Sequence, residues 1–245
     1  MGVDWSSRLI ATWSLVVALV VVHVVTAVHQ WNLYYVQLFQ GLVQDRDLRF
    51  KAAVGGQYAP LVDAGDVYRL FTSTVLHGDA LHLVVNGLAL LALGRLLEPW
   101  FGKLRVLVWF SLGAVGASGI SHLAGAPQSD GASGGAFALL GVALVLGWRH
   151  RMDFEPTTRR VMGPVLWAFT AGNVLLSFAV PFIDASAHLG GLALGLVFGL
   201  AARTAGFRTP GWVAKGLGVP WLLAWAVICV GGFAWAMAGP WPLPW

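Results

Sequence analysis

Seven long apolar stretches divide this chain, and they constrain its fold more than any other feature. Each can cross a hydrocarbon core of about 30 Å, which takes around 20 helical residues. The stretches are residues 9–28, 80–97, 104–124, 132–148, 161–180, 185–202 and 219–238. Only 11% of the residues are charged, against roughly 25% in soluble domains. The sequence therefore predicts an all-α, polytopic membrane helix bundle that forms a single membrane domain over residues 1–245.

Basic residues are distributed unevenly among the connections between these stretches. The turns 125–131 and 181–184 contain no Lys or Arg. Basic residues occur instead in the N-terminal segment and in or beside the other short connections. They are Arg8 before the first stretch, Arg95, Lys103 and Arg105 flanking the turn between the second and third stretches, Arg149, Arg151, Arg159 and Arg160 between the fourth and fifth, and Arg203, Arg208 and Lys215 between the sixth and seventh. The positive-inside rule then predicts a cytoplasmic N-terminus and an extracytoplasmic C-terminus. This topology accounts for the net charge of +4 without a nucleic-acid partner.

The first apolar stretch is interpreted as a retained span rather than a cleaved signal peptide, because it is long and no small-residue cleavage site follows. The connection 30–79 combines mixed charge with many aromatic residues, which is typical of a partly helical segment at the membrane interface. Twelve Arg against three Lys, with abundant Gly, Ala and Val, indicate a GC-rich bacterium and hence the cell membrane.

Polar residues gather at one depth in three of the predicted spans. With the predicted orientation, the spans 80–97, 132–148 and 185–202 all begin at the outer face. His82 and Asn86 lie near the start of the first of these spans, Ser133 at the start of the second and His188 one turn into the third. A polar group inside hydrocarbon is costly and is usually functional, so this coincidence predicts a site.

Two stripes of residues at three- and four-residue spacing, each of which includes small residues, can bring two of these helices together. The stripes consist of Ser133, Phe137 and Gly141 in one helix, and of His188, Gly191, Gly195 and Gly199 in the other. Small residues on such stripes allow close helix approach in a membrane. We therefore expect the Ser133 hydroxyl within hydrogen-bond reach of the His188 imidazole, which is the requirement for an activated serine.

This arrangement assigns Ser133 as a nucleophile and His188 as its base. The oxyanion formed on a substrate carbonyl needs donors, and the candidates are the Ser133 backbone N–H, the Asn86 amide and His82. Asp184 precedes His188 by four residues, but its place at the start of a span predicts a helix N-cap. The sequence therefore predicts a dyad rather than a triad.

Taken singly, each of these residues also has a structural explanation. A serine in a span commonly bonds the carbonyl one turn back, and His or Asn can link helices for about 0.6 kcal/mol per pair. A zinc site formed by His77, His82 and His188 is conceivable, but the chain has no H-E-x-x-H motif and no carboxylate at ligand spacing. No metal and no other cofactor is expected.

In this order and at this spacing, these residues resemble those of the rhomboid intramembrane serine proteases. The resemblance covers about residues 66–199 and is carried by Tyr68-Arg69, His77, His82 with Asn86, Glu98, Gly131-Ala132-Ser133-Gly134 with Gly141, and Ala187-His188-Leu189-Gly190-Gly191 with Gly195. It implies a six-helix core over 9–204 with a membrane-embedded first loop at 30–79, followed by an additional C-terminal transmembrane helix at 219–238.

The resemblance also implies which residues form the catalytic site. It implies a dyad of Ser133 and His188, with His82, Asn86 and the Ser133 amide around the oxyanion. The residues that it implies as support for the site are Gly131, Gly134, Phe137 and Gly191. Phe137 stands where many members have Tyr, and either ring can stack on an imidazole.

The implied activity is cleavage of transmembrane proteins near the outer end of a span. The implied partners are transmembrane substrates and the lipid bilayer, with no nucleic acid and no predicted oligomeric state. One alternative is a non-catalytic relative that binds or escorts membrane proteins, but such a chain should have lost Ser133 or His188. A transporter would need ionisable residues near the midplane and paired broken helices, and the sequence shows neither.

Overall fold

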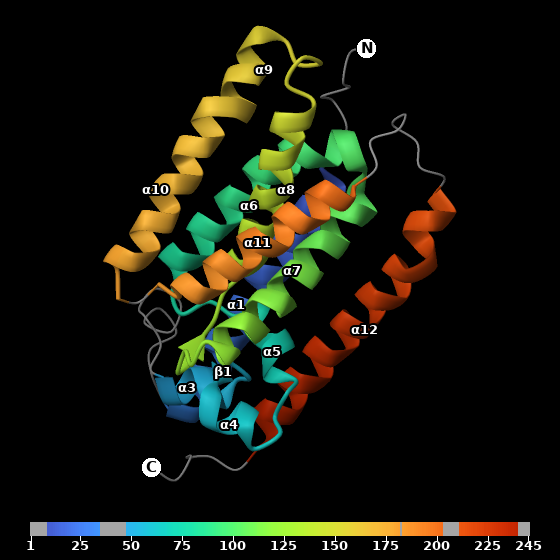
Figure 1. The fold of residues 1–245 in the computed structure, drawn as a ribbon. Helices are drawn as coiled ribbons and strands as arrows, with labels where there is room; N and C mark the ends of the chain where they lie inside the picture. The colour runs from blue at the N-terminus through green and yellow to red at the C-terminus, as the bar shows by residue number, and fades with distance from the viewer. Residues whose placement is uncertain (1–8, 35–47, 182, 203–210, 240–245) are drawn as a thin grey trace.

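The computed structural model describes residues 9–34, 48–181, 183–202 and 211–239 and consists almost entirely of α-helices (Figure 1). The long helices are α1 (Ile10–Tyr34), α6 (Ala80–Phe101), α7 (Lys103–Leu123), α8 (Ser133–Arg149), α10 (Leu166–Ala179), α11 (Ala185–Ala201) and α12 (Gly211–Ala238). Every predicted apolar stretch is therefore helical, and the predicted all-α class is confirmed. By length and composition, five of the helices in the described part can cross a membrane, whereas α8 and α11 are shorter apolar helices.

Short elements fill the connection between α1 and α6. They are α3 (Leu48–Ala53), β1 (Gln57–Tyr58), α4 (Ala59–Asp63), α5 (Arg69–Thr72) and the 3-10 turn Ser73–Val75. Strand β1 pairs antiparallel with β2 (Gln128–Ser129), which lies just before α8. These two short strands were not predicted. Residues 35–47 of the predicted interfacial loop lie outside the described residues, and its position relative to the membrane remains a prediction.

Helix α8 lies at the centre of the bundle. All its residues from Gly134 to Gly147 are buried, and it packs against α11, α7 and α6. Because the helix is enclosed by protein, its apolar sequence on every face needs no lipid. Its 17 residues span only about 25 Å, less than the roughly 30 Å of a hydrocarbon core. A helix of this length can begin below the membrane surface.

Glycine permits close backbone contact between α8 and α11. A Cβ atom at Gly191 would overlap the Gly134 carbonyl, and one at Gly195 would overlap the Ala138 carbonyl. A Cβ atom at Gly141 would lie 2.6 Å from the Leu192 carbonyl oxygen. The predicted small-residue stripes therefore face each other, and the close approach predicted for these helices is confirmed.

Buried polar contacts fix the elements around this pair. Glu98, at the end of α6, accepts hydrogen bonds from the backbone N–H of Thr12 at 2.8 Å and from its hydroxyl, which ties α6 to the start of α1. Arg69 is 4% exposed and binds Asp66 at 2.9 Å and the carbonyls of Ala52 and Gly56. These bonds close the first loop on itself and satisfy a buried cation.

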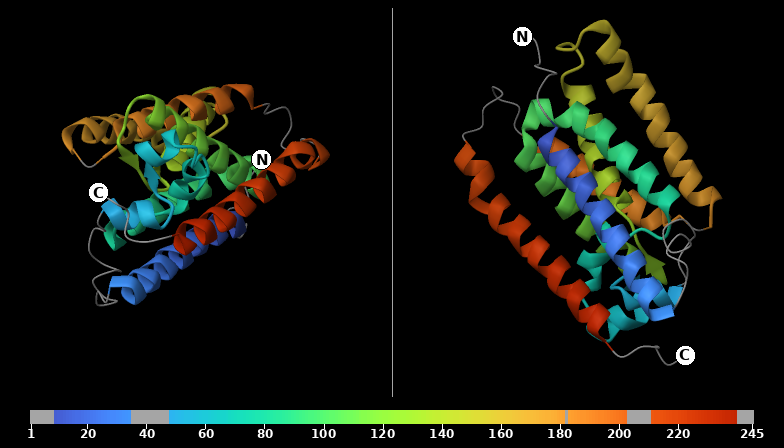
Figure 2. Two further views of the ribbon diagram at one scale, coloured as in Figure 1. Left: turned by 90° about the horizontal axis from the view of Figure 1, so that it is seen from below. Right: turned by 180° about the vertical axis from the view of Figure 1, so that it is seen from behind.

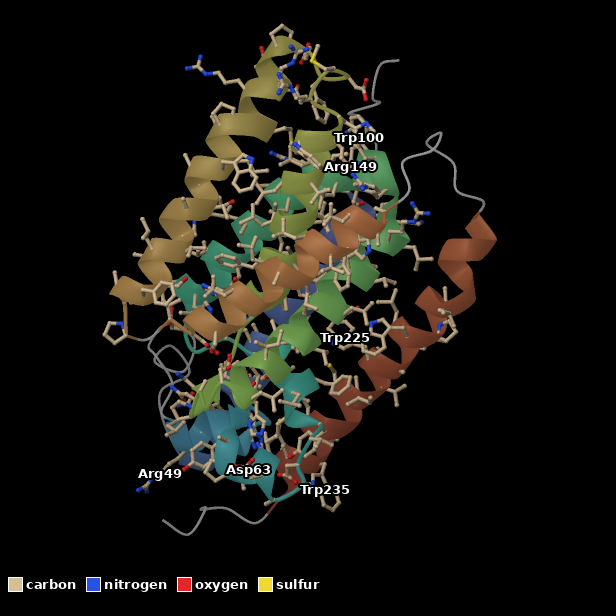
Figure 3. All side chains as sticks on the ribbon, viewed as in Figure 1. Arg49, Asp63, Trp100, Arg149, Trp225 and Trp235 are labelled. Atoms are coloured by element: carbon tan, nitrogen blue, oxygen red, sulfur yellow. The ribbon has the colours of Figure 1, made fainter. Side chains whose placement is uncertain are left out.

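The remaining helices lie around this core. α9 (Pro156–Arg160) and a π-helical turn, Val161–Val165, lead into α10 at one edge of the molecule, and α12 forms the opposite edge (Figure 2). α12 packs on α7, where the Trp221 indole donates a hydrogen bond to the Ser111 hydroxyl at 2.8 Å. The ring of Trp225 packs edge to face on Phe110, with ring centroids 6.3 Å apart (Figure 3). Arg149 lies at the end of the bundle opposite Asp63 (Figure 3).

Candidate active site

Ser133 is the first residue of α8 and follows a turn that only glycine fits easily. Gly131 has a φ of 121°, a conformation that side chains rarely adopt, and a Cβ there would lie 2.7 Å from the His82 ring. The Gly131 N–H donates to the Ser73 carbonyl at 2.9 Å, and the Ala132 N–H donates to His77 Nε2 at 3.4 Å. The turn therefore fixes the backbone that presents Ser133.

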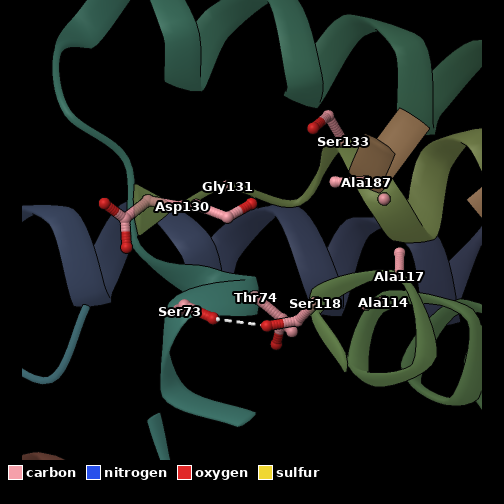
Figure 4. Close-up of a pocket in the computed structure, with 11 residues that line it drawn as sticks. Ser73, Thr74, Ala114, Ala117, Ser118, Asp130, Gly131, Ser133 and Ala187 are labelled. Atoms are coloured by element: carbon pink, nitrogen blue, oxygen red, sulfur yellow. Dashed lines mark hydrogen bonds between the residues drawn. The ribbon is translucent and has the colours of Figure 1, made fainter. Parts of the chain in front are cut away.

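A pocket of about 230 Å³, including the open solvent at its mouth, lies beside Ser133 (Figure 4). It is lined by Ser73, Thr74, Ala114, Ala117, Ser118, Ser129, Asp130, Gly131, Ser133, Gly134 and Ala187. The Ser73 and Ser118 hydroxyls lie 3.2 Å apart, and Ser118 also donates to Gln57 Oε1 at 2.5 Å. The pocket thus offers hydroxyl groups and water-sized space next to a partly exposed serine.

His188 lies in the first turns of α11 and faces the side of α8 that bears Ser133. Its ring stacks on Phe137, with ring centroids 4.1 Å apart and an interplanar angle of 17°. Phe137 follows Ser133 by four residues and therefore shares its helical face. Ser133 and His188 are both described and both partly exposed, yet their side chains are not hydrogen-bonded to each other here. Catalytic hydrogen bonds are often long without substrate and tighten when it binds.

The other contact of the His188 ring comes from α10. His188 Nδ1 lies 2.7 Å from the Ser177 hydroxyl, which also donates to the Asn173 carbonyl at 2.7 Å. Ser177 was not among the predicted site residues. It lies near the end of span 161–180, so its depth, the same as that predicted for Ser133, was predictable from its position in the sequence.

His82 and Asn86 lie on α6 and approach the turn before Ser133. Asp79 caps α6 by accepting the His82 N–H at 2.8 Å. The His82 and His77 rings pack edge to face, with their centroids 5.0 Å apart. Asn86 is 5% exposed and donates to the His82 carbonyl at 3.1 Å. A Cβ at Gly131 would lie 3.7 Å from Asn86 Nδ2. The amide keeps a second N–H for another acceptor.

Asp184 is the N-cap of α11, as predicted from the sequence. It accepts the Ala187 N–H at 3.0 Å, and its oxygens also accept the hydroxyls of Ser186 at 2.5 Å and of Ser121. Burial alone would raise the pKa of Asp184, but hydrogen bonds from these groups and from Ser129 outweigh it and lower the pKa below its ordinary value. The carboxylate therefore holds the start of α11 against α7 and β2.

Within the described ranges, no group of three or more His, Cys, Asp or Glu side chains is arranged to hold a metal ion. His77 and His82 are neighbours, but His77 Nε2 accepts the Ala132 N–H, so this nitrogen is already used within the turn that precedes Ser133.

Comparisons with known proteins point to one family. The rhomboid domain matches residues 64–204. Rhomboid protease GluP of Bacillus subtilis (strain 168) is 34% identical over 150 residues, covering 61% of this chain and 29% of that protein. RHOMBOID-like protein 5 of Arabidopsis thaliana is 32% identical over 162 residues, covering 64% and 52%. Rhomboid protease GlpG of Enterobacter sp. (strain 638) is 30% identical over 156 residues, covering 63% and 55%. The matched region thus spans little more than half, or less, of these relatives.

Proposed function

Because the chain belongs to the rhomboid family, we propose that this multi-pass membrane protein is a serine endopeptidase that cleaves transmembrane proteins, with Ser133 as nucleophile and His188 as base. The observation that carries the proposal is the contact of His188 with Phe137 on the Ser133 face of α8. Glycine contacts between Gly134 and Gly191 support it, because they hold the two helices close at this depth.

In the proposed reaction, Ser133 Oγ attacks the carbonyl carbon of the substrate while its proton passes to His188 Nε2. The resulting oxyanion lies near the N-terminus of α8, where the Ser133 backbone N–H points outward and the helix dipole favours negative charge. The second N–H of Asn86 and the His82 ring are the further donors. His188 then returns the proton to the leaving amine, which leaves an ester on Ser133.

Water completes the cycle. A water molecule attacks the ester carbonyl as His188 takes one of its protons, and the C–O bond to Ser133 breaks as His188 returns that proton to Ser133 Oγ. The products are a new carboxylic acid and free Ser133. The pocket beside Ser133 supports this step, since its hydroxyl groups offer water both donors and acceptors.

The basic connections support an orientation for this reaction. Arg149, at the C-terminal end of α8, belongs to a cluster with Arg151, Arg159 and Arg160, and the positive-inside rule assigns this cluster to the cytoplasm. Ser133, at the opposite end of α8, then lies toward the extracytoplasmic face. We propose that the protein lies in a bacterial cell membrane and cleaves substrates near the outer ends of their spans.

A panel of single-span proteins with small-residue, helix-breaking outer ends, co-expressed with this chain, tests the proposal. Wild-type protein should produce fragments, and Ser133→Ala should abolish them because the covalent route loses its nucleophile. Ser14→Ala is the matched control: this serine on α1 donates to the Ile10 carbonyl far from the site and should leave cleavage unchanged. Undiminished cleavage by Ser133→Ala would refute the proposal.

A fluorophosphonate probe separates this enzyme from a non-catalytic relative that binds or escorts membrane proteins. Ser133 should be labelled in the wild-type protein, and labelling should disappear in His188→Ala, since the base is then missing. A folded wild-type protein whose Ser133 resists the probe would favour the non-catalytic alternative.

A further inference from the structure

We infer that Ser177 is a positioning residue whose hydroxyl holds the His188 imidazole in the neutral tautomer that can take a proton from Ser133. This inference rests on the proposed function, because it assumes that His188 is the base. Ser177 lies on α10, is 4% exposed, and its Oγ lies 2.7 Å from His188 Nδ1. A third group thus reaches the proposed dyad from a different helix.

The direction of this hydrogen bond follows from the position of the single Ser177 proton. Ser177 Oγ also lies 2.7 Å from the carbonyl oxygen of Asn173, one turn earlier in α10. A carbonyl can only accept, so the hydroxyl proton is donated to Asn173. The lone pairs of Ser177 Oγ then face His188, and the proton between the two side chains belongs to Nδ1.

This tautomer leaves the other ring nitrogen free to act. A neutral imidazole carries one N–H, so a proton on Nδ1 leaves a lone pair on Nε2. When Nε2 takes the Ser133 proton, Nδ1–H can still donate to Ser177. The hydroxyl orients the ring as a carboxylate does in a Ser-His-Asp triad, but without a charge.

Two other neighbours of His188, Asp184 and Phe137, do not fill this role. The Asp184 oxygens accept hydrogen bonds from Ser121, Ser186 and the Ala187 N–H. Phe137 fixes the plane of the imidazole through the stacked contact, but its ring has no group that can select a tautomer. Of these three neighbours, only Ser177 bonds a ring nitrogen.

Nitrogen NMR on the full chain in detergent, labelled with ¹⁵N-histidine, tests the tautomer directly. The His188 signals are assigned by their loss in His188→Ala. We expect Nδ1 to carry the proton in the wild-type protein and in Ser133→Ala, and a shift toward an Nε2 proton in Ser177→Ala. A wild-type His188 protonated on Nε2, or a tautomer unchanged in Ser177→Ala, would overturn the inference.

Kinetics provide the functional test. Ser177→Ala should lower kcat by about 10- to 100-fold with little change in KM, as expected from loss of one hydrogen bond to a group that becomes charged. Ser177→Thr retains the hydroxyl and should restore most of the rate. Thr170→Val is the matched control, because Thr170 is equally buried on α10 but donates only to the Leu166 carbonyl, at 2.8 Å.

The outcomes separate the two proposals. Equal losses in Thr170→Val and Ser177→Ala would mean general damage to α10 and would overturn the inference. Full cleavage by Ser133→Ala would instead refute the protease proposal, while the NMR measurement, which needs no activity, would still decide the tautomer. If Ser177→Ala fails to fold, the wild-type spectrum alone decides whether Nδ1 carries the proton.

Discussion

Replacement of Gly141 by alanine tests whether the proposed site depends on the contact between α8 and α11. The new Cβ atom would lie 2.6 Å from the Leu192 carbonyl oxygen, 2.7 Å from the Leu196 nitrogen and 2.8 Å from the Gly195 carbonyl carbon. All three are backbone atoms of α11, so no side-chain rotation can relieve the overlap. The helices must separate.

The size of the separation follows from these distances. Ordinary van der Waals contact begins at 3.4 Å, so the Cβ falls about 0.8 Å short of it. Misplacement of reacting groups by about 1 Å can cost on the order of 10²-fold in rate. We therefore expect kcat/KM to fall by roughly 10- to 100-fold, because Ser133 and His188 lie on the two helices that move apart. Overpacking of this kind typically costs about 1–3 kcal/mol of stability.

Cleavage kinetics and thermal unfolding in detergent measure both effects. Gly172→Ala is the matched control: Gly172 is exposed on α10, and a Cβ there meets no atom within 4 Å. It should keep full activity and gain slightly in stability through helix propensity. If Gly141→Ala matches Gly172→Ala in both rate and unfolding temperature, the close backbone contact is not needed and the reasoning fails.

Two further predictions concern the surroundings of Ser133 and the start of α11. Asn86→Ala should lower kcat by about 10²- to 10³-fold if the amide is an oxyanion donor, and a change confined to KM would contradict that role. Asp184 has a lowered pKa in the folded protein, so its contribution to stability is present above the unfolded value of about 3.9 and is lost as pH falls through the lower folded value. Thermal unfolding between pH 6 and pH 3 should therefore show a steeper acid loss in wild-type protein than in Asp184→Asn, and identical slopes would contradict it.

Much of the fold was predictable because a membrane imposes its constraints locally. A segment that crosses hydrocarbon must satisfy its own backbone hydrogen bonds, so a long apolar run predicts a helix without knowledge of its neighbours. All seven apolar runs are helices in the structure. The close approach of the two stripes that contain Gly141 and Gly195 was also predictable from the sequence. Close approach of two helices requires small residues at helical spacing.

The candidate site was predictable only in part. The coincidence in depth of Ser133 and His188 followed from topology, and Asp184 was correctly assigned as an N-cap. The contact between Ser177 and His188 was missed, because a serine in a span commonly bonds only the carbonyl one turn back. Ser177 does make that bond, to Asn173. Its position in span 161–180 indicates its depth, but its contact with the imidazole on the next helix depends on how α10 and α11 pack.

The sequence by itself determined where the helices lie, their order and which of their residues are too polar to face lipid without a purpose. The tertiary structure decided that α8 is enclosed at the centre, that β1 pairs with β2 across some 70 residues of chain, and that α10 supplies a partner to His188. The physical reason is the distance along the chain over which each interaction acts. Hydrophobic length and helical spacing act within one segment, whereas a hydrogen bond between two helices depends on their relative rotation and distance, which the packing of the whole bundle fixes.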